Sequence, residues 1–229
     1  MPRLNRVAPI GVPQHVIQRG NNRQVCFASE QDFYAYAAWL KEYADKFNVD
    51  VHAWVFMTNH VHLLCSPNTV AAVSKMMQSL GRMYVRYSNR SYGRTGTLWE
   101  GRFKSCLVDS ESYLLELYRY IELNPVRASM VIDPAEYKWS SYRCNALGLV
   151  NSLFSPHRLY LALGETSQQR QTTYRDLFKV QISDSMISDI RNCTNKGLAL
   201  GNTRFIDQIE ALAQARVSQA VIGRPRVKA

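Results

Sequence analysis

Residues 51–65 read VHAWVFMTNHVHLLC, and this stretch decides the fold. Residues 51–57 are apolar at nearly every position, which is typical of a strand whose two faces are both at least partly covered. Thr58 and Asn59 favour a tight turn, and the short apolar run 60–65 then fits the antiparallel partner of the first strand. The stretch therefore predicts a β-hairpin.

Strand-like and helix-like patterns alternate on both sides of this hairpin through the first 148 residues. They predict a strand at 15–19, a turn at 20–22, a helix at 30–47, an amphipathic helix at 70–90, a strand at 102–108 and a helix capped by Asp109 or Ser110. That last helix must end near Asn124, because Pro125 disfavours helical geometry in the residue before it. The order predicts an α+β protein with a ferredoxin-like antiparallel sheet and helices on one face.

The pattern is weaker after Gly148. Residues from 152 onward indicate mostly helix, most clearly at 202–220, and the basic end at 223–229 is typical of a flexible tail. We therefore expect one domain at 1–148 and an additional, mostly helical C-terminal region with a basic tail at 149–229.

The composition is that of a globular protein, with 46% hydrophobic and 20% charged residues. No apolar run approaches the roughly 20 residues that cross a bilayer, and the start lacks the layout of a signal peptide, so we expect a cytoplasmic protein. The five cysteines form no C-x-x-C pair, which argues against a zinc ribbon or a redox motif.

The formal net charge of +10 favours a polyanionic partner. Seven basic residues lie between positions 75 and 104 against a single acid, Glu100. We expect nucleic-acid contacts from Arg82, Arg86, Arg90, Arg94, Arg102 and Lys104, the first three of which form a stripe along one helix. Tyr84, Tyr92 and Trp99 are candidate stacking platforms for unpaired bases. A solvated helix face is the alternative interpretation of the stripe.

His60 and His62 are two residues apart on a predicted strand, so both imidazoles project from one face. Such a pair can hold a metal ion through two nitrogens. The alternative is a pair of structural histidines bonded to backbone or water. The H-x-H pattern alone does not decide between these two interpretations.

Tyr120 and Asn124 are four residues apart on a predicted helix and should share one face. The amide oxygen of Asn124 can complete a metal site with the two histidines, and this hard ligand suits Mg²⁺ or Mn²⁺. The hydroxyl of Tyr120 can attack a phosphodiester and store the bond as a phosphotyrosine. Tyr118 is a rival nucleophile, offset by about 200° on the helix, and core packing is the commoner role of a tyrosine.

A phenol is a weak acid, so a tyrosine nucleophile needs a proton acceptor or local positive charge. A divalent cation on the scissile phosphate supplies such charge. Glu116, one helical turn before Tyr120, is a candidate general base. Solvent or a displaced water molecule is the alternative acceptor.

Four segments together resemble a known family. They are residues 57–64 (MTNHVHLL), 118–128 (YRYIELNPVRA), 15–23 (HVIQRGNNR) and 98–105 (LWEGRFKS). The combination is similar to the HUH-superfamily single-tyrosine transposases of the IS200-like family, most nearly to the REP-associated tyrosine transposases. The resemblance spans residues 12–147, within the domain expected at 1–148.

The resemblance implies metal ligation by His60, His62 and Asn124, with Mg²⁺ or Mn²⁺ as cofactor. It also implies that Tyr120 forms a 5′-phosphotyrosine and releases a 3′-hydroxyl. Related insertion-sequence enzymes carry Gln in place of Asn124. The implied substrate is single-stranded hairpin DNA from a palindromic repeat element.

The sequence thus predicts a metal-dependent single-strand DNA endonuclease and strand transferase, either as a monomer or as a homodimer. The main alternative is a protein of the same fold that binds structured single-stranded DNA or RNA without cutting it. A zinc hydrolase is disfavoured because the chain lacks a third histidine in a suitable motif.

Overall fold

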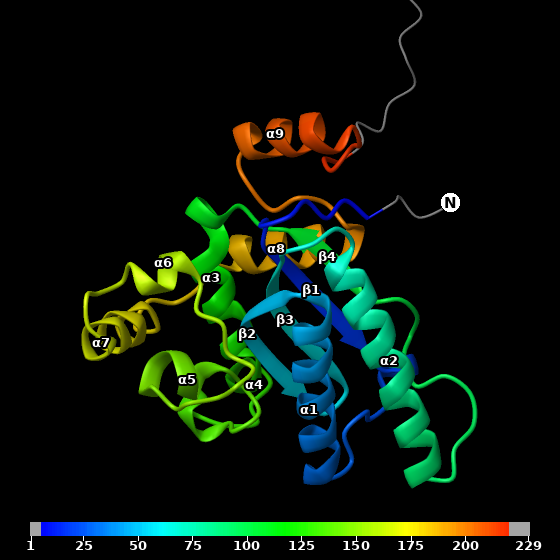
Figure 1. The fold of residues 1–229 in the computed structure, drawn as a ribbon. Coiled ribbons are helices and arrows are strands. Elements are labelled where there is room, and N and C mark those ends of the chain that lie inside the picture. The colour runs from blue at the N-terminus through cyan, green and yellow to red at the C-terminus, as the bar shows by residue number, and fades with distance from the viewer. Residues whose placement is uncertain (1–5, 220–229) are drawn as a thin grey trace, which may run out of the picture.

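A four-stranded antiparallel sheet forms the centre of the computed structural model, which describes residues 6–219 (Figure 1). Its strands are β1 (Gln14–Arg19), β2 (Val49–Met57), β3 (His60–Pro67) and β4 (Lys104–Leu107), in the order β2-β3-β1-β4. The predicted hairpin is β2 and β3, in which Met57 pairs with His60. This order is that of a ferredoxin-like sheet, so the predicted α+β class is confirmed.

Helices α1 (Glu30–Phe47) and α2 (Ala72–Ser91) cover one face of the sheet, close to their predicted bounds. A capping box between Ser29 and Asp32 starts α1 by satisfying backbone N–H groups that the first turn leaves open. The aromatic side chains of β2, Trp54 and Phe56, point into this layer. It is the larger part of the hydrophobic core.

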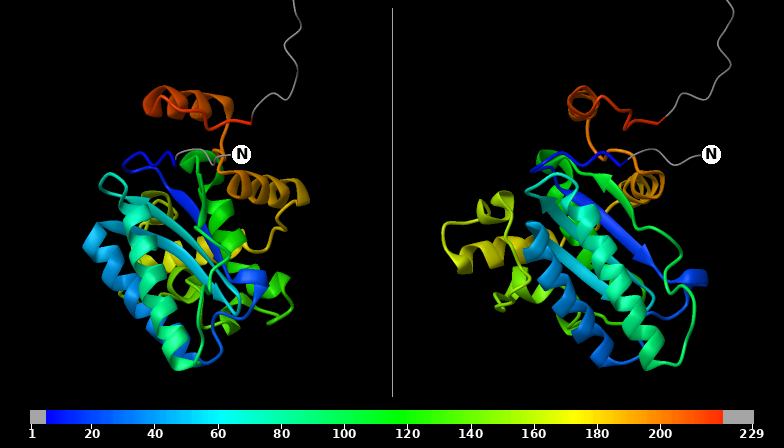
Figure 2. Two further views of the ribbon diagram at one scale, coloured as in Figure 1. Left: turned by 90° about the vertical axis from the view of Figure 1, so that its right-hand side faces the viewer. Right: turned by 45° about the vertical axis from the view of Figure 1, so that its right-hand side comes forward.

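The expectation of helices on one face holds for α1 and α2, the two helices of the ferredoxin-like unit, whereas the further helix α3 (Ser110–Glu122) lies on the opposite face. Figure 2 shows α1 and α2 on one side of the sheet and α3 on the other. The physical reason is that Ala53 and Val55 of β2 and Leu64 of β3 are apolar on this second face and need cover from water. Asp109 caps α3 as predicted, accepting a hydrogen bond from the backbone of Glu111.

The remaining elements are short helices: η1 (Asn21–Arg23), α4 (Asn124–Arg127), η2 (Pro134–Glu136), α5 (Tyr142–Leu147), α6 (Arg158–Leu161), α7 (Ser167–Leu177), α8 (Asp184–Lys196) and α9 (Thr203–Ala213). The helix predicted at 202–220 thus ends at Ala213. The basic tail predicted at 223–229 lies outside the described residues. Within residues 6–219, every helix is too short or too polar to cross a membrane.

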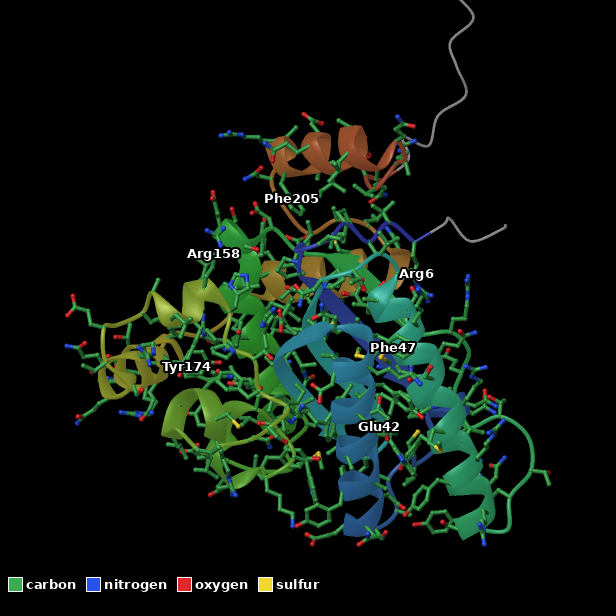
Figure 3. All side chains as sticks on the ribbon, in the orientation of Figure 1. Arg6, Glu42, Phe47, Arg158, Tyr174 and Phe205 are labelled. Atoms are coloured by element: carbon green, nitrogen blue, oxygen red, sulfur yellow. The ribbon has the colours of Figure 1, made fainter. Side chains whose placement is uncertain are left out.

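The C-terminal helices share the core around α3. Tyr174 of α7 (Figure 3) and Ile190 of α8 are fully buried in the same cluster as the apolar side chains of α3. The buried carboxylate of Glu122 accepts hydrogen bonds from Tyr174 (2.7 Å), Ser141 (2.5 Å) and Asn145 (2.7 Å). Residues on both sides of position 148 therefore build one continuous core on this face.

Candidate active site

The two histidines of β3 lie on the face of the sheet that α3 covers. Their neighbours Val61 and Leu63 point into the α1 and α2 layer, as strand alternation requires. The ring centroids of His60 and His62 are 5.0 Å apart. The two imidazoles thus lie side by side on one face of the sheet, as their spacing in the sequence predicts.

The phenol ring of Tyr120 lies beside this pair. Its centroid is 5.8 Å from that of His62, at an interplanar angle of 74°. Tyr118 points away and packs against Tyr174, with ring centroids 6.1 Å apart. The tyrosine of α3 and the histidines of β3 therefore meet within one chain, and Tyr120 is the tyrosine on their side.

His60, His62, Tyr120 and Asn124 all line one pocket of about 520 Å³. Its charged lining residues are Arg19, Glu100, Arg102, Lys104, Arg127 and Arg191. Cations outnumber the single carboxylate by five to one among these residues. Such a pocket suits an anionic ligand.

A chain of hydrogen bonds sets the tautomer of His62. The Thr194 hydroxyl donates to the carbonyl of Ile190 (2.8 Å), so its oxygen accepts from Nδ1 of His15 (2.9 Å). Nε2 of neutral His15 must then accept from Nδ1 of His62, 2.9 Å away. His62 consequently keeps the lone pair of its Nε2 for a ligand.

A shorter chain of hydrogen bonds sets the tautomer of His60 in the same way. Its Nδ1 lies 2.6 Å from Oδ1 of Asn59, whose amide nitrogen donates to the carbonyl of Arg23 (3.1 Å). Because Asn59 offers an oxygen, His60 donates from Nδ1 and keeps the lone pair of Nε2. In both His60 and His62, Nε2 is therefore the nitrogen whose lone pair is available for a ligand.

Burial keeps these imidazoles neutral. It lowers the pKa of His15 to about 3, and burial with the nearby Arg19 charge lowers the pKa of His60 to about 4. The pKa of His62 is also held well below its usual value, first by burial and then by its charged neighbours. A neutral imidazole is the form that can bind a metal ion.

Asn124 adds an oxygen to this set. Its Nδ2 donates to the backbone carbonyls of Tyr120 (3.0 Å) and Ile121 (3.1 Å), so its Oδ1 remains for a ligand. Residues 6–219 hold no group of three or more His, Cys, Asp or Glu side chains that could bind a metal. Two imidazole nitrogens and one amide oxygen nevertheless fit a hard divalent cation that completes its shell with water or phosphate.

Arg127 is a site residue that the sequence analysis missed. Its guanidinium lies 4.4 Å above the Tyr120 ring and donates to the Tyr120 carbonyl (2.5 Å). A fixed positive charge here favours any negative charge that develops on the phenol oxygen. The only sequence signal was its place in the quoted segment 118–128.

His15 and Thr194 were also missed, for different reasons. His15 belongs to the quoted segment 15–23, but nothing local to that segment shows its partner. Thr194 lies in α8, outside every quoted segment. Arg191 and Asn195 of α8 line the pocket as well, so the C-terminal region forms part of its wall.

Glu116, the candidate general base, is not among the residues that line the pocket. Both of its carboxylate oxygens accept hydrogen bonds from Arg119, at 2.9 and 2.7 Å. Because Glu116 does not line the pocket, solvent stays the simpler candidate acceptor.

The predicted DNA-binding residues lie in three places. Arg82, Arg86 and Arg90 are exposed along α2, as the stripe predicts. Arg102 and Lys104 reach the active-site pocket. Arg94 donates to Gln24 (2.7 Å) instead of lining that pocket.

The expectation that Tyr84 and Trp99 serve as stacking platforms is wrong. Both are buried in the core, with 0% and 5% of their surface exposed. Their large apolar rings pack between α1, α2 and the sheet, where burial is more favourable than exposure to water. Tyr92 is exposed at 43%, and its hydroxyl donates to Asp32 (2.7 Å).

Comparison with known proteins identifies the family. The family model described as "Transposase IS200 like" matches residues 11–124. The chain therefore belongs to the IS200-like transposase family. No functionally curated protein matches the sequence.

Solved structures show a related fold. A REP-associated tyrosine transposase bound to a REP hairpin superposes with a TM-score of 0.52 at 15% identity, covering 69% of this chain and 93% of that one. A candidate transposase from Deinococcus radiodurans matches at 17% identity with a TM-score of 0.38, covering 53% of this chain and 96% of the other. The first similarity confirms the fold, and the second is too distant to add to it.

Proposed function

We propose that this transposase-family protein is a metal-dependent single-strand DNA endonuclease and strand transferase with Tyr120 as its nucleophile. One observation carries the proposal. The ring centroid of Tyr120 lies 5.8 Å from that of His62, the imidazole whose hydrogen bonds leave the lone pair of Nε2 available. The proposal is consistent with a family that is generally metal-dependent.

The metal ligands in this proposal are Nε2 of His60, Nε2 of His62 and Oδ1 of Asn124. Mg²⁺ or Mn²⁺ suits this mixture of ligands. When bound, the cation would neutralise charge on the scissile phosphate and orient it for attack. Arg102 and Lys104, which line the same pocket, would hold the neighbouring phosphates.

Tyr120 then acts as the nucleophile. Its phenol oxygen attacks the scissile phosphorus, the bond to the 3′-oxygen breaks, and the departing 3′-oxygen takes a proton from solvent to leave as a hydroxyl. The phenol proton passes to solvent, while the guanidinium of Arg127 over the ring stabilises the developing charge. The resulting 5′-phosphotyrosine keeps the bond available for attack by a second 3′-hydroxyl, which is strand transfer.

The proposed substrate is single-stranded hairpin DNA. A protein of similar fold is known bound to a REP hairpin, and this chain carries a net charge of +10. The exposed stripe of Arg82, Arg86 and Arg90 can follow a phosphate backbone. One chain supplies the nucleophile and all three ligands, so a homodimer is not needed to complete the site.

The test is covalent trapping. A library of hairpin strands with unpaired flanks is incubated with protein and Mn²⁺, and adducts are resolved on a denaturing gel and sequenced. We expect adducts from the wild type and from the matched control Tyr118→Phe, but none from Tyr120→Phe or in EDTA. Retention of hairpins without an adduct in any sample would favour the non-cutting binder instead.

A further inference from the structure

Helix α8 brings two side chains of the C-terminal region to the active-site pocket. Arg191 and Asn195 are one helical turn apart, and both line the pocket that holds Tyr120. The helix lies on the same side of the sheet as α3 (Figure 2). It is outside residues 11–124, the part of the chain that the family model matches. The pocket therefore contains side chains for which the family match does not account.

Two buried side chains hold α8 in place on either side of Arg191. Ile190, which is fully buried, packs in the same core cluster as the apolar side chains of α3. Thr194 is 1% exposed, and its hydroxyl oxygen accepts a hydrogen bond from His15 of β1 (2.9 Å). Because both contacts are made by the buried face of α8, they fix the direction in which Arg191 leaves the helix. Arg191 therefore belongs to a fixed wall of the pocket.

The positive charge of Arg191 is not neutralised by the protein. Arg191 is exposed, and within residues 6–219 it donates no hydrogen bond and forms no ion pair. Arg127, whose guanidinium lies over the Tyr120 ring, likewise has no carboxylate partner in the described part of the chain. Glu100, the single acid that lines the pocket, pairs with neither arginine. Two guanidinium groups thus face one pocket without a counter-charge.

These two guanidinium groups are close enough to repel each other. The pKa of Arg127 is lowered, first by burial; Tyr120 acts in the opposite direction, and the charge of Arg191 adds to the lowering. Like charges disfavour each other's ionised form, so their proximity opposes the stability of the empty pocket. An anion bound between the two arginines would remove this repulsion. The pair is therefore suited to bind an anion.

Phosphate is the anion that fits both the side chains and the place. A guanidinium group offers a planar set of N–H donors that matches two oxygens of one phosphate. Arg127 lies 4.4 Å from the centre of the Tyr120 ring, so an anion shared by the two arginines lies on the Tyr120 side of the pocket. In the proposed reaction, the scissile phosphate is the group that must approach Tyr120.

We propose that Arg191 is a catalytic residue that binds the scissile phosphate together with Arg127, an inference that rests on the proposed function. Negative charge grows on the nonbridging oxygens while the phenol oxygen of Tyr120 bonds to phosphorus and the bond to the 3′-oxygen breaks. Arg191 donates hydrogen bonds to these oxygens and transfers no proton, so it lowers the barrier by charge stabilisation. The same phosphate stays on Tyr120 after cleavage, and Arg191 therefore also acts in strand transfer.

The first experiment compares Arg191→Gln with Lys196→Gln in single-turnover adduct formation on a trapped hairpin strand with Mn²⁺. Both substitutions remove one positive charge from α8, but Lys196 does not line the active-site pocket. We expect Arg191→Gln to slow adduct formation about 10- to 100-fold, the effect of losing a charge-assisted hydrogen bond. Lys196→Gln should stay within about twofold of the wild type. Equal rates in the two variants would overturn the proposal.

A change in the substrate identifies the phosphate that Arg191 binds. A second hairpin strand carries a methylphosphonate at the scissile position, so that a methyl group replaces one nonbridging oxygen and removes the charge. If Arg191 binds this phosphate, the loss of rate in Arg191→Gln should shrink at least about threefold on the modified strand. The same loss of rate on both strands would show that Arg191 acts elsewhere, which contradicts the proposal.

A measurement without cleavage separates this proposal from the nuclease assignment. Inorganic phosphate is titrated into the full chain in EDTA, and ¹⁵N NMR follows the side-chain Nε–H resonances of Arg127 and Arg191, each assigned from its loss in the Gln variant. We expect both resonances to move with one binding curve, and sodium chloride of equal ionic strength to leave them in place. An Arg191 resonance that does not respond to phosphate would overturn the proposal.

The two assignments fail in different ways. If the nuclease assignment failed, the wild type would form no covalent adduct with hairpin strands, while both arginine resonances would still respond to phosphate. If the role of Arg191 failed, the wild type and Arg191→Gln would form adducts at the same rate.

Discussion

The rings of His15 and His62 lie nearly parallel, with centroids 5.1 Å apart, and share a hydrogen bond of 2.9 Å between Nε2 and Nδ1. This bond fixes the orientation and tautomer of His62, so we expect His15→Leu to weaken Mn²⁺ binding about 10- to 100-fold. His15→Gln, whose amide oxygen can accept the same bond, should lose less. Calorimetric Mn²⁺ titration of both variants, with circular dichroism melts as a folding control, checks this. Equal affinity in His15→Leu and wild type would show that the bond has no effect on the site.

The next bond in the chain joins His15 to Thr194, 179 residues further along the sequence. Thr194→Val keeps the shape but removes the acceptor, so we expect a severalfold loss of Mn²⁺ affinity. Thr194→Ser keeps the hydroxyl and should bind like the wild type. If valine and serine variants bind Mn²⁺ equally, α8 supports the pocket by packing alone.

The hairpin, the helices at 30–47 and 70–90, and the facing of His60 and His62 were all predictable, because each depends on a local period of residues. The face of the sheet that α3 covers was not predictable in this way. The apolar stripe of α3 shows that it packs against something, but not against which layer. The Thr194 contact was invisible for the same reason, since no local pattern connects residues so far apart.

The arginine stripe and two aromatic residues near it in the sequence show that charge and burial must be predicted separately. Arg82, Arg86 and Arg90 are exposed, as their spacing predicts. Tyr84 of α2 and Trp99 of the loop that follows lie inside, because an aromatic ring close to basic residues in the sequence can equally face the core. Sequence proximity alone therefore assigned them to the wrong surface.

Glu116 offers a sharp test of the proton path. Its carboxylate is paired with Arg119 and is not part of the pocket, so Glu116→Gln should keep the rate of adduct formation within about threefold, below the factor of 10² or more typical of a general base. Single-turnover kinetics on a trapped hairpin measures the rate. A loss of a hundredfold or more, with unchanged hairpin binding, would make Glu116 the base after all.

Acid should destabilise the fold through His157, a histidine that does not line the active-site pocket. His157 caps α6 by accepting a hydrogen bond from Leu159 N (3.2 Å), and burial, then His52 and Arg158, lowers its pKa to about 4. The folded chain therefore takes up a proton at His157 less readily than the unfolded chain does. The stabilisation that neutral His157 gives the fold is complete above about pH 6.5 and is lost as the pH falls toward 4.

The measurement is urea unfolding between pH 7.5 and 5. We expect the free energy of unfolding to fall with pH in the wild type and to fall less in His157→Asn, because asparagine caps a helix without titrating. Parallel curves for the two proteins would assign the acid sensitivity to other groups.

The account as a whole depends on a divalent cation beside Tyr120. A crystal of the protein soaked in Mn²⁺ and measured at the manganese absorption edge tests this most directly. We predict an anomalous peak at bonding distance from Nε2 of His60, Nε2 of His62 and Oδ1 of Asn124, with the Tyr120 hydroxyl facing it. A manganese peak only at another position would contradict the account. So would the absence of a peak at saturating Mn²⁺ while the two histidines keep the hydrogen bonds described above.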